Sequence, residues 1–233
     1  MTKLTITIDG PAGSGKSTTA RLLAEKIGAA FLDTGAMYRA VTLAAMQSRS
    51  DLNNVEALEK LIDSTNFKFD INNSHSPRCD RVATGMTVKI NNKDITEQIR
   101  DPKVTENVFF IASVPSLRNK LVEMQRNFAE KYQKIVTEGR DQGTIVFPNA
   151  DYKFFLTAEA AQRTKRRAKE MIEKGLEVDT AKLRKEIENR DAADKNRDTG
   201  PLVPAKDAII IDNTNLALEQ TVNEILKIIN KND

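Results

Sequence analysis

Alternating apolar and polar residues open the chain, and the pattern then changes to helical spacing. Residues 3–9 (Lys-Leu-Thr-Ile-Thr-Ile-Asp) alternate apolar or β-branched side chains before a glycine-rich turn, which predicts a β-strand. From Ser17 to Ile27 the apolar residues recur at helical spacing, which predicts a helix that Gly28 ends. The chain therefore begins with a strand, a turn and a helix.

Later apolar segments predict further strands that alternate with helices. We expect strands at 30–32, 134–137, 152–156 and 208–211. Helical patterns cover about 103–112, 116–132, 158–174, 180–197 and 216–229. Strands that alternate with helices favour a doubly wound α/β fold, so we expect a five-stranded parallel sheet.

Residues 66–100 interrupt this rhythm. Alternating pieces such as Phe67-Lys-Phe-Asp-Ile and Thr87-Val-Lys-Ile are separated by Asn, Ser and Gly turns, which predicts a small antiparallel β insert. Asn91 and Asn92 have the position of a hairpin tip, since Asn tolerates left-handed backbone angles. We therefore divide the chain into a core, residues 1–65 and 101–233, and an insert, residues 66–100.

The turn after the first strand carries the most specific motif. Its sequence Gly-Pro-Ala-Gly-Ser-Gly-Lys-Ser, ending at Ser17, matches G-x-x-x-x-G-K-[ST] and lies between a strand and a helix. In such a phosphate loop the backbone N–H groups point at phosphates, Lys16 reaches the β- and γ-phosphates, and the Ser17 hydroxyl binds Mg²⁺. We therefore expect a nucleoside triphosphate site made of Gly10, Pro11, Ala12, Gly13, Ser14, Gly15, Lys16, Ser17 and Thr18.

A phosphate loop is common to switch GTPases, ATPase motors and small-molecule kinases. A GTPase also needs D-x-x-G after a later strand, and no Asp in this sequence has Gly three residues on. Residues 230–233 spell the guanine motif N-K-x-D, but we discount it because no helix follows to hold a guanine pocket.

Two other strand ends carry polar residues. Asp33-Thr-Gly-Ala-Met-Tyr-Arg39 opens a helix after the second strand, which would place Thr34 and Arg39 on the same rim as the phosphate loop. Arg39 can bind a second phosphate there, although Asp33 or Thr34 can equally be an ordinary helix cap. Residues 137–144 (Thr-Glu-Gly-Arg-Asp-Gln-Gly-Thr) follow another strand, and carboxyl ends of parallel strands are where such sheets bind ligands.

Together these motifs resemble the bacterial cytidylate kinase family. The resemblance continues through Glu-Gly-Arg-Asp-Gln-Gly-Thr-Ile-Val-Phe-Pro (138–148), the segment 188–197, Pro-Leu-Val-Pro (201–204) and the segment 207–212, and so spans essentially the whole chain. It implies a three-layer P-loop kinase fold, with the β insert on the monophosphate-binding side and a helical lid at about 158–175. It also implies Mg²⁺-dependent transfer of the γ-phosphoryl group of ATP to CMP or dCMP.

The resemblance also assigns acceptor residues. Arg190, Asp194 and Arg197 have i, i+4, i+7 spacing and so share one helix face, although a salt-bridged helix would show the same spacing. By position, the resemblance gives phosphate to Arg39, Arg140 and Arg197, sugar and phosphate to Asp194 with Arg190, and the cytosine edge to Arg118 and Asp141.

A basic run at 163–169 has three interpretations: a solvated helix face, a nucleic-acid patch or a mobile lid. We favour the lid, because nucleotide kinases use lid arginines to neutralise charge on the transferring group and to exclude water. Arg163 and Arg167 are then the candidate catalytic arginines beside Lys16 and Arg140. We name no general base, since positioning and electrostatics carry phosphoryl transfer.

Phe109 departs from the family pattern. It stands where family members often have a serine that contacts the base, so cytosine would be read by fewer hydrogen bonds unless Ser113 comes into range. His75 and Cys79, in the turn region of the insert, are assigned no role.

Composition narrows the classes of protein further. Hydrophobic residues are 39% and charged residues 30% of the 233, which fits a globular protein, and a net charge of +3 does not favour nucleic-acid binding. A lone Cys79 suits a reducing compartment, and no apolar run is long enough for a membrane helix. We therefore expect a cytoplasmic monomer. The alternatives are a kinase that prefers UMP or another base, and a P-loop switch that binds nucleotide without an acceptor.

Overall fold

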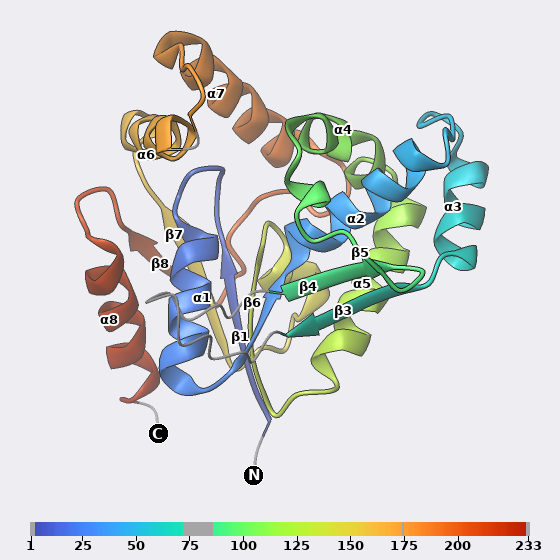
Figure 1. Cartoon of the computed structure of the whole chain (residues 1–233). Coiled ribbons are helices and arrows are strands. Elements are labelled where there is room, and N and C mark those ends of the chain that lie inside the picture. The colour runs from blue at the N-terminus through green and yellow to red at the C-terminus, as the bar shows by residue number, and fades with distance from the viewer. Residues whose placement is uncertain (1–2, 72–85, 174, 232–233) are drawn as a thin grey trace, which may run out of the picture. The chain divides into compact units, whose positions relative to one another are not determined.

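The computed structural model describes residues 3–71, 86–173 and 175–231 (Figure 1). His75 and Cys79 lie outside these residues, as does the end of the discounted motif at 230–233. The chain forms two compact units: Met1–Ala29 with Lys134–Asp233, called the first unit below, and Ala30–Gln133, called the second unit.

A five-stranded parallel sheet is present, as the sequence predicts, with strand order β2-β6-β1-β7-β8. The strands are β1 (Leu4–Asp9), β2 (Ala30–Asp33), β6 (Lys134–Gly139), β7 (Tyr152–Thr157) and β8 (Ile209–Asp212). In the first unit, β1 pairs in parallel with β6 and β7, and β7 pairs in parallel with β8. The side chains of Ile6, Ile8 and Phe154 are almost fully buried, so these strands carry the core of this unit.

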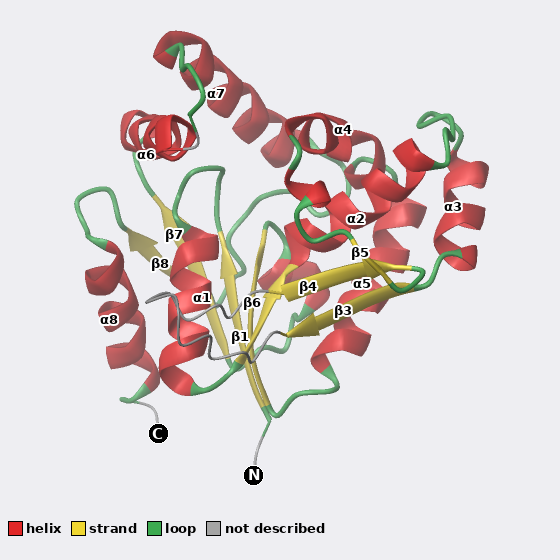
Figure 2. Ribbon diagram, in the orientation of Figure 1, coloured by secondary structure: helices red, strands yellow, loops and turns green. Residues whose placement is uncertain are grey.

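The helices of the first unit also agree with the predicted pattern, within three residues at each end. They are α1 (Lys16–Ile27), α6 (Ala160–Glu173), α7 (Thr180–Asn196) and α8 (Leu218–Ile229). α1 ends at Gly28, whose φ of 62° puts it in the left-handed conformation expected of a glycine cap. α8 packs beside α1 through a stripe that includes Val222 and Ile225 (Figure 2).

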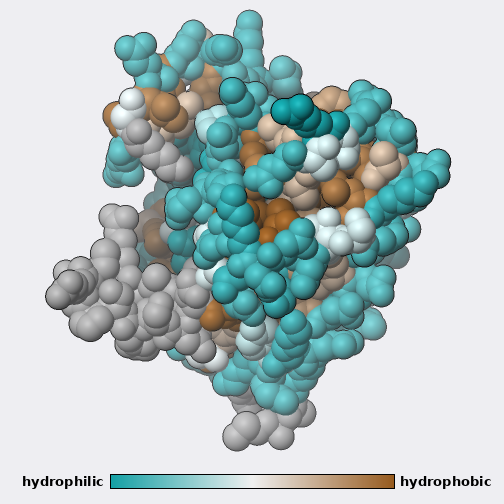
Figure 3. Space-filling model, turned by 45° about the vertical axis from the view of Figure 1, so that its right-hand side comes forward, coloured by the Kyte–Doolittle hydropathy of each residue, from teal (hydrophilic) through white to brown (hydrophobic). Residues whose placement is uncertain are grey.

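α6 and α7 form a helix pair with a small core of its own. Ala168 of α6 packs with Leu183 and Ile187 of α7. Ile172 and Leu176, close to the connection between the two helices, are largely exposed, and Figure 3 shows hydrophobic residues at the surface in this part of the chain. The core that the pair shares is therefore small, and it leaves these two apolar side chains at the surface.

The second unit contains the small antiparallel sheet. Its elements are α2 (Thr34–Gln47), α3 (Val55–Ser64), β3 (Phe67–Ile71), β4 (Met86–Ile90), β5 (Lys93–Asp94), η1 (Gln98–Arg100), α4 (Pro102–Ala112) and α5 (Pro115–Ala129). β4 pairs antiparallel with both β3 and β5. Asn91 and Asn92 have φ angles of 49° and 67°, which confirms the predicted hairpin tip.

Within the described residues, no helix has the length and hydrophobicity needed to cross a membrane.

Candidate active site

The phosphate loop, residues 10–15, connects the carboxyl end of β1 to the first turn of α1. Gly10 has no room for a side chain, because a Cβ there would lie 2.2 Å from the carbonyl oxygen of Leu156. Gly15 is the N-cap of α1 with φ 84°, and it has no side chain to bond the first amides of the helix. The N-terminus of α1 is therefore built to receive an anion.

Lys16 is buried at the start of α1, with only 7% of its surface exposed. Its Nζ donates a hydrogen bond to the carbonyl oxygen of Pro11 at 3.2 Å. Burial and the positive charge of Arg140 lower the pKa of the Lys16 ammonium, against the opposing effect of Glu138, and the net result is a pKa of about 7. A negative ligand in the loop would stabilise the charged form of this lysine.

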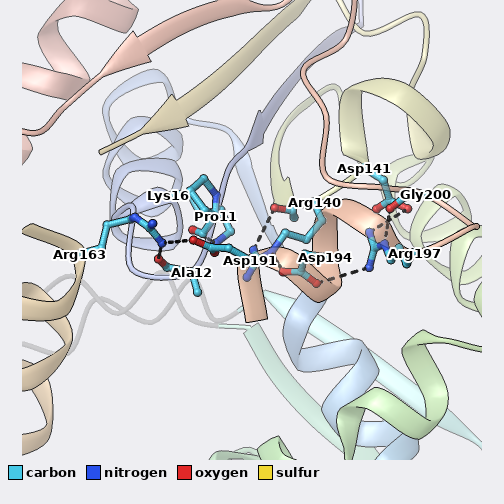
Figure 4. A network of polar contacts seen from close by, with 11 residues as sticks. Pro11, Ala12, Lys16, Arg140, Asp141, Arg163, Asp191, Asp194, Arg197 and Gly200 are labelled. Carbon is cyan, nitrogen blue, oxygen red and sulfur yellow. Dashed lines mark hydrogen bonds and ion pairs between the residues drawn. The ribbon is translucent and has the colours of Figure 1, made fainter. Parts of the chain in front are cut away.

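Arg163 of α6 lies against the phosphate loop (Figure 4). Its guanidinium donates to the carbonyl oxygens of Ala12 at 2.9 Å and Ala158 at 3.0 Å, and it pairs with Asp191 of α7 at 2.6 Å. Arg167, the second predicted lid arginine, instead pairs with Glu170 of its own helix and is half exposed. Within the first unit, the structure therefore brings Arg163 to the loop and leaves Arg167 at the surface.

Arg166 also reaches the loop, although it was not among the predicted site residues. Its guanidinium donates to the carbonyl oxygen of Asn213 at 2.6 Å, to Asn213 Oδ1 at 3.0 Å and to the carbonyl oxygen of Ser14 at 3.4 Å. Asn213 Nδ2 donates to the same Ser14 oxygen at 2.8 Å. The carbonyl of Ser14 is thereby held by side chains from α6 and from the loop after β8.

Four predicted acceptor residues meet at the carboxyl end of β6 (Figure 4). Arg140 donates through Nε to Asp194 Oδ2 at 2.7 Å. Arg197 lies 3.9 Å from Asp194 and 4.0 Å from Asp141, and its Nε donates to the carbonyl oxygen of Gly200. These side chains are at most 18% exposed, so their charges interact in a partly desolvated site.

The ionisation of Asp194 follows from these neighbours. Burial by itself would raise its pKa, but the charge and the hydrogen bond of Arg140, with the charges of Arg190 and Arg197, hold the pKa below its usual value. Asp194 is therefore a carboxylate surrounded by three arginines. Asp194 can accept hydrogen bonds from a ligand. Because three arginines surround one carboxylate, the cluster keeps a net positive charge that can attract an anionic ligand.

In the second unit, Asp33 is the side-chain cap of α2. Its carboxylate accepts from the backbone N–H of Ala36 at 2.8 Å, from Arg39 at 3.4 Å and from Arg100 at 3.3 Å. The capping interpretation of Asp33 is thus confirmed, and the two arginines beside it form a positive cluster. Thr34, the first residue of α2, is buried.

Arg118 of α5 is also placed firmly within the second unit. It is buried, donates to the carbonyl oxygen of Ala112 at 3.1 Å, and lies 5.8 Å from the ring centre of Tyr38. Phe109 of α4 is 65% exposed and contacts Phe110 edge-on, and Ser113 follows the end of α4. Phe109 is therefore a large apolar side chain that the second unit leaves uncovered.

Comparison with known proteins identifies the family. The sequence model of the cytidylate kinase family matches residues 6–231. The chain belongs to this family. A cytidylate kinase of Clostridium botulinum (strain Okra, type B1) is 43% identical over 231 residues, which is 99% of this chain and 100% of the relative. A cytidylate kinase of Desulforamulus reducens is 44% identical over 226 residues, 97% and 96% of the two chains.

Solved structures agree with the fold of this family member. A Thermus thermophilus protein matches with a TM-score of 0.51 at 16% identity, covering 100% of this chain and 98% of that one. An uncharacterized protein from Eubacterium ventriosum matches with the same TM-score and identity, covering 98% and 99%. These two matches concern the fold alone. Membership of the cytidylate kinase family is what makes the chain a kinase, an enzyme that transfers a phosphoryl group.

Sequence reasoning missed several residues of this kinase that, each within its own unit, bond the predicted residues or the loops that carry them. They are Asp9, Arg100, Arg166, Asn213 and Asp191. Arg166 belongs to the basic run at 163–169, but residues three and four apart lie on the same helix face, so spacing could not rank it against Arg167. Asn213 and Asp9 stand at strand ends, which was the available signal for both.

Proposed function

We propose that this protein uses ATP and Mg²⁺ to phosphorylate CMP and dCMP to the diphosphates. Membership of the cytidylate kinase family over residues 6–231 carries the proposal. The buried Lys16 and the arginine cluster around Asp194, both in the first unit, supply the charge that two phosphorylated ligands need.

On the donor side, the triphosphate of ATP binds the backbone N–H groups of the phosphate loop, except at Pro11, which has none, and the N-terminus of α1. Lys16 pairs with the β- and γ-phosphates. The half-buried Ser17 directly follows Lys16, and its hydroxyl is an oxygen donor of the kind Mg²⁺ prefers. Ser17 would hold the metal, and Mg²⁺ bound there would supply positive charge that offsets the charge of the phosphates.

On the acceptor side, we propose the roles that the family resemblance assigns. Arginines hold the monophosphate and the carboxylate of Asp194 meets the sugar. Arg118 and Asp141 read the cytosine edge, and the exposed Phe109 supplies apolar contact without a hydrogen bond. The proposed acceptor residues are Thr34, Arg39, Arg118, Arg140, Asp141, Arg190, Asp194 and Arg197.

Catalysis then consists of alignment and charge stabilisation. Lys16 and Arg140 stabilise charge on the transferring group, and Arg163 and Arg167 belong to a lid at about 158–175 that excludes water. The insert at 66–100 would belong to the monophosphate-binding side, as the family resemblance implies. We further propose a monomer that acts on small nucleotides and binds neither nucleic acid nor membrane.

The test is ADP production from MgATP with CMP, dCMP, UMP, AMP and GMP offered separately, with a no-acceptor control and a chelator control. We expect turnover with CMP and dCMP that exceeds turnover with the other acceptors and stops when EDTA removes the metal. Lys16→Met should abolish it, whereas Lys26→Met, an exposed lysine on the same helix, should not. ADP formed without acceptor, or preference for another base, would contradict the proposed substrate.

A further inference from the structure

Asp9 is a buried carboxylate that the functions assigned above leave unused. It is the last residue of β1, directly before Gly10, and only 4% of its surface is exposed. A buried charged group is costly unless hydrogen bonds stabilise it, so its partners indicate its purpose.

Both oxygens of Asp9 bond the backbone that follows β6. Gln142 N–H donates to Oδ1 at 2.9 Å and Gly143 N–H donates to Oδ2 at 2.8 Å. These are the first two residues of η2 (Gln142–Val146), a short π-helical turn of a type often found at functional sites. Two adjacent amides that point at one carboxylate fix the direction of the backbone between them.

The residues directly before this turn are Arg140 and Asp141, both proposed acceptor residues. Strand pairing holds the chain only as far as Gly139, which lies opposite Asp9 in the parallel register. Beyond Gly139 the turn is held by Asp9 and by a side-chain bond from Thr137 Oγ1 to Gln142 Oε1 at 2.8 Å. Asp9 therefore fixes the backbone where sheet pairing has ended.

The ionisation of Asp9 reflects a balance. Burial raises its pKa, the two amide bonds lower it, and Asp141 raises it while Arg140 lowers it, and the net result is a pKa of about 7. The fold thus accepts an unfavourable buried carboxylate in order to bond these two amides, as is common where a site is preorganised.

We infer that Asp9 is a positioning residue for the acceptor nucleotide: by bonding the amides of Gln142 and Gly143, it holds Arg140 and Asp141 in their binding orientation. The inference rests on the proposed function, because it takes these two residues as acceptor ligands. It predicts an effect on the acceptor that exceeds any effect on ATP.

The matched variants are Asp9→Asn and Asp151→Asn. The amide of Asn has the same size as the carboxylate but can accept only one of the two N–H bonds in the same geometry. Asp151 bonds the N–H of Thr5 through Oδ2 at 2.7 Å and lies next to the opposite end of β1, where it is exposed. Each variant therefore removes a carboxylate that accepts a hydrogen bond from a backbone N–H group, but only the Asp9 carboxylate bonds the turn that follows Arg140.

The experiment measures KM for ATP, KM for the acceptor that the wild-type protein uses, and kcat, at about pH 8, where Asp9 is ionised. We expect Asp9→Asn to raise the acceptor KM about tenfold or more and the ATP KM less than threefold. Asp151→Asn should match the wild type in both. Equal increases in the two KM values for Asp9→Asn, or a wild-type acceptor KM, would overturn the inference.

Amide hydrogen exchange gives a second readout that does not depend on which acceptor is used. Exchange at Gln142 and Gly143 should be faster in Asp9→Asn than in the wild type, at temperatures where both proteins are folded. Unchanged exchange at both amides would also overturn the inference. If the wild type did not use CMP, in contrast, that result would contradict the proposed substrate. The exchange rates of these two amides would then still test the role of Asp9.

Discussion

Arg140 and Asp194 form an ion pair at 2.7 Å between Nε and Oδ2, although 54 residues separate them in the sequence. The pair joins the carboxyl end of β6 to α7, the helix that also carries Arg190 and that ends just before Arg197. It is mostly shielded from water, so each charge depends on the other. A nucleotide phosphate that enters this cluster would compete with Asp194 for the guanidinium of Arg140.

Arg190 provides a direct test of the acceptor side. It lies on the same helix as Asp194 and lowers the pKa of that carboxyl, and its own side chain is exposed. We expect Arg190→Ala to raise the acceptor KM about 10- to 100-fold, because one or two charged hydrogen bonds are lost. The KM for ATP should change little.

The matched control for that variant is Arg184→Ala. Arg184 is on the same helix and is exposed, and it pairs with Glu188 at 2.8 Å. Its removal should change activity less than about twofold, because exposed pairs contribute little. Steady-state kinetics with each substrate varied in turn measures both proteins, and equal losses for ATP and acceptor in Arg190→Ala would count against an acceptor role.

The features that the sequence predicted correctly are those that depend on a few neighbouring residues. Gly28 at the end of α1 and the Asn91–Asn92 tip were predicted because each needs a backbone angle that few residues adopt. The phosphate loop was equally clear, since its glycines, Lys16 and Ser17 are contiguous. Helix ends differed by up to three residues, because fraying and capping decide them.

The sequence did not predict the contacts between segments that are far apart along the chain. Asp9 meets Gly143 across 134 residues, and Asn213 meets Ser14 across 199. No periodicity links such pairs, and each side chain alone looks like an ordinary strand-end residue. The π-helical turn at Gln142–Val146 was likewise not predicted: the sequence marked residues 137–144 only as a strand end, and Asp9, which bonds the first amide of the turn, is distant in the sequence.

Lys16 should take up a proton when ATP binds. Its pKa in the ligand-free protein is about 7, so above that pH the amine is mostly neutral, and a bound triphosphate favours the charged form and raises the pKa. We expect proton uptake approaching one per ATP at about pH 8, and little uptake at about pH 6, where Lys16 already carries its charge.

Titration calorimetry in buffers of different ionisation enthalpy measures this uptake. Because Asp9 also has a pKa of about 7, the Asp9→Asn protein is a necessary control and should still take up the proton. The Lys16→Met protein should not. Uptake that is the same at both pH values, or that disappears in Asp9→Asn, would show that another group titrates.

Phe109 offers a test of base selection. Its side chain is 65% exposed, so Phe109→Ser should cost little stability, and it would introduce a hydroxyl at the position where the family resemblance implies a serine that contacts the base. We expect the ratio of kcat/KM for CMP to that for UMP to rise about 2- to 12-fold, the value of one hydrogen bond. Val55→Ser, an exposed apolar position on α3, controls for the substitution, and an unchanged ratio in Phe109→Ser would separate this position from the base.

Arg163 and Arg167 were predicted as equivalent lid arginines, and their surroundings now distinguish them. Arg163 contacts the carbonyl of Ala12 in the phosphate loop and is balanced by Asp191, while Arg167 pairs with Glu170 in solvent. We expect Arg163→Ala to lower kcat/KM for ATP about 100-fold, because it removes a charge beside the phosphates and leaves Asp191 without its counterion.

Arg167→Ala should lower the same constant less than about threefold, since its ion pair is half exposed. Arg163→Lys keeps the charge but cannot reproduce both hydrogen bonds of the guanidinium, so it should restore only part of the loss. Thermal unfolding of each variant separates a folding defect from a catalytic one. A loss in Arg167→Ala as large as that in Arg163→Ala would mean that α6 moves on binding ATP far enough to bring Arg167 onto the phosphates.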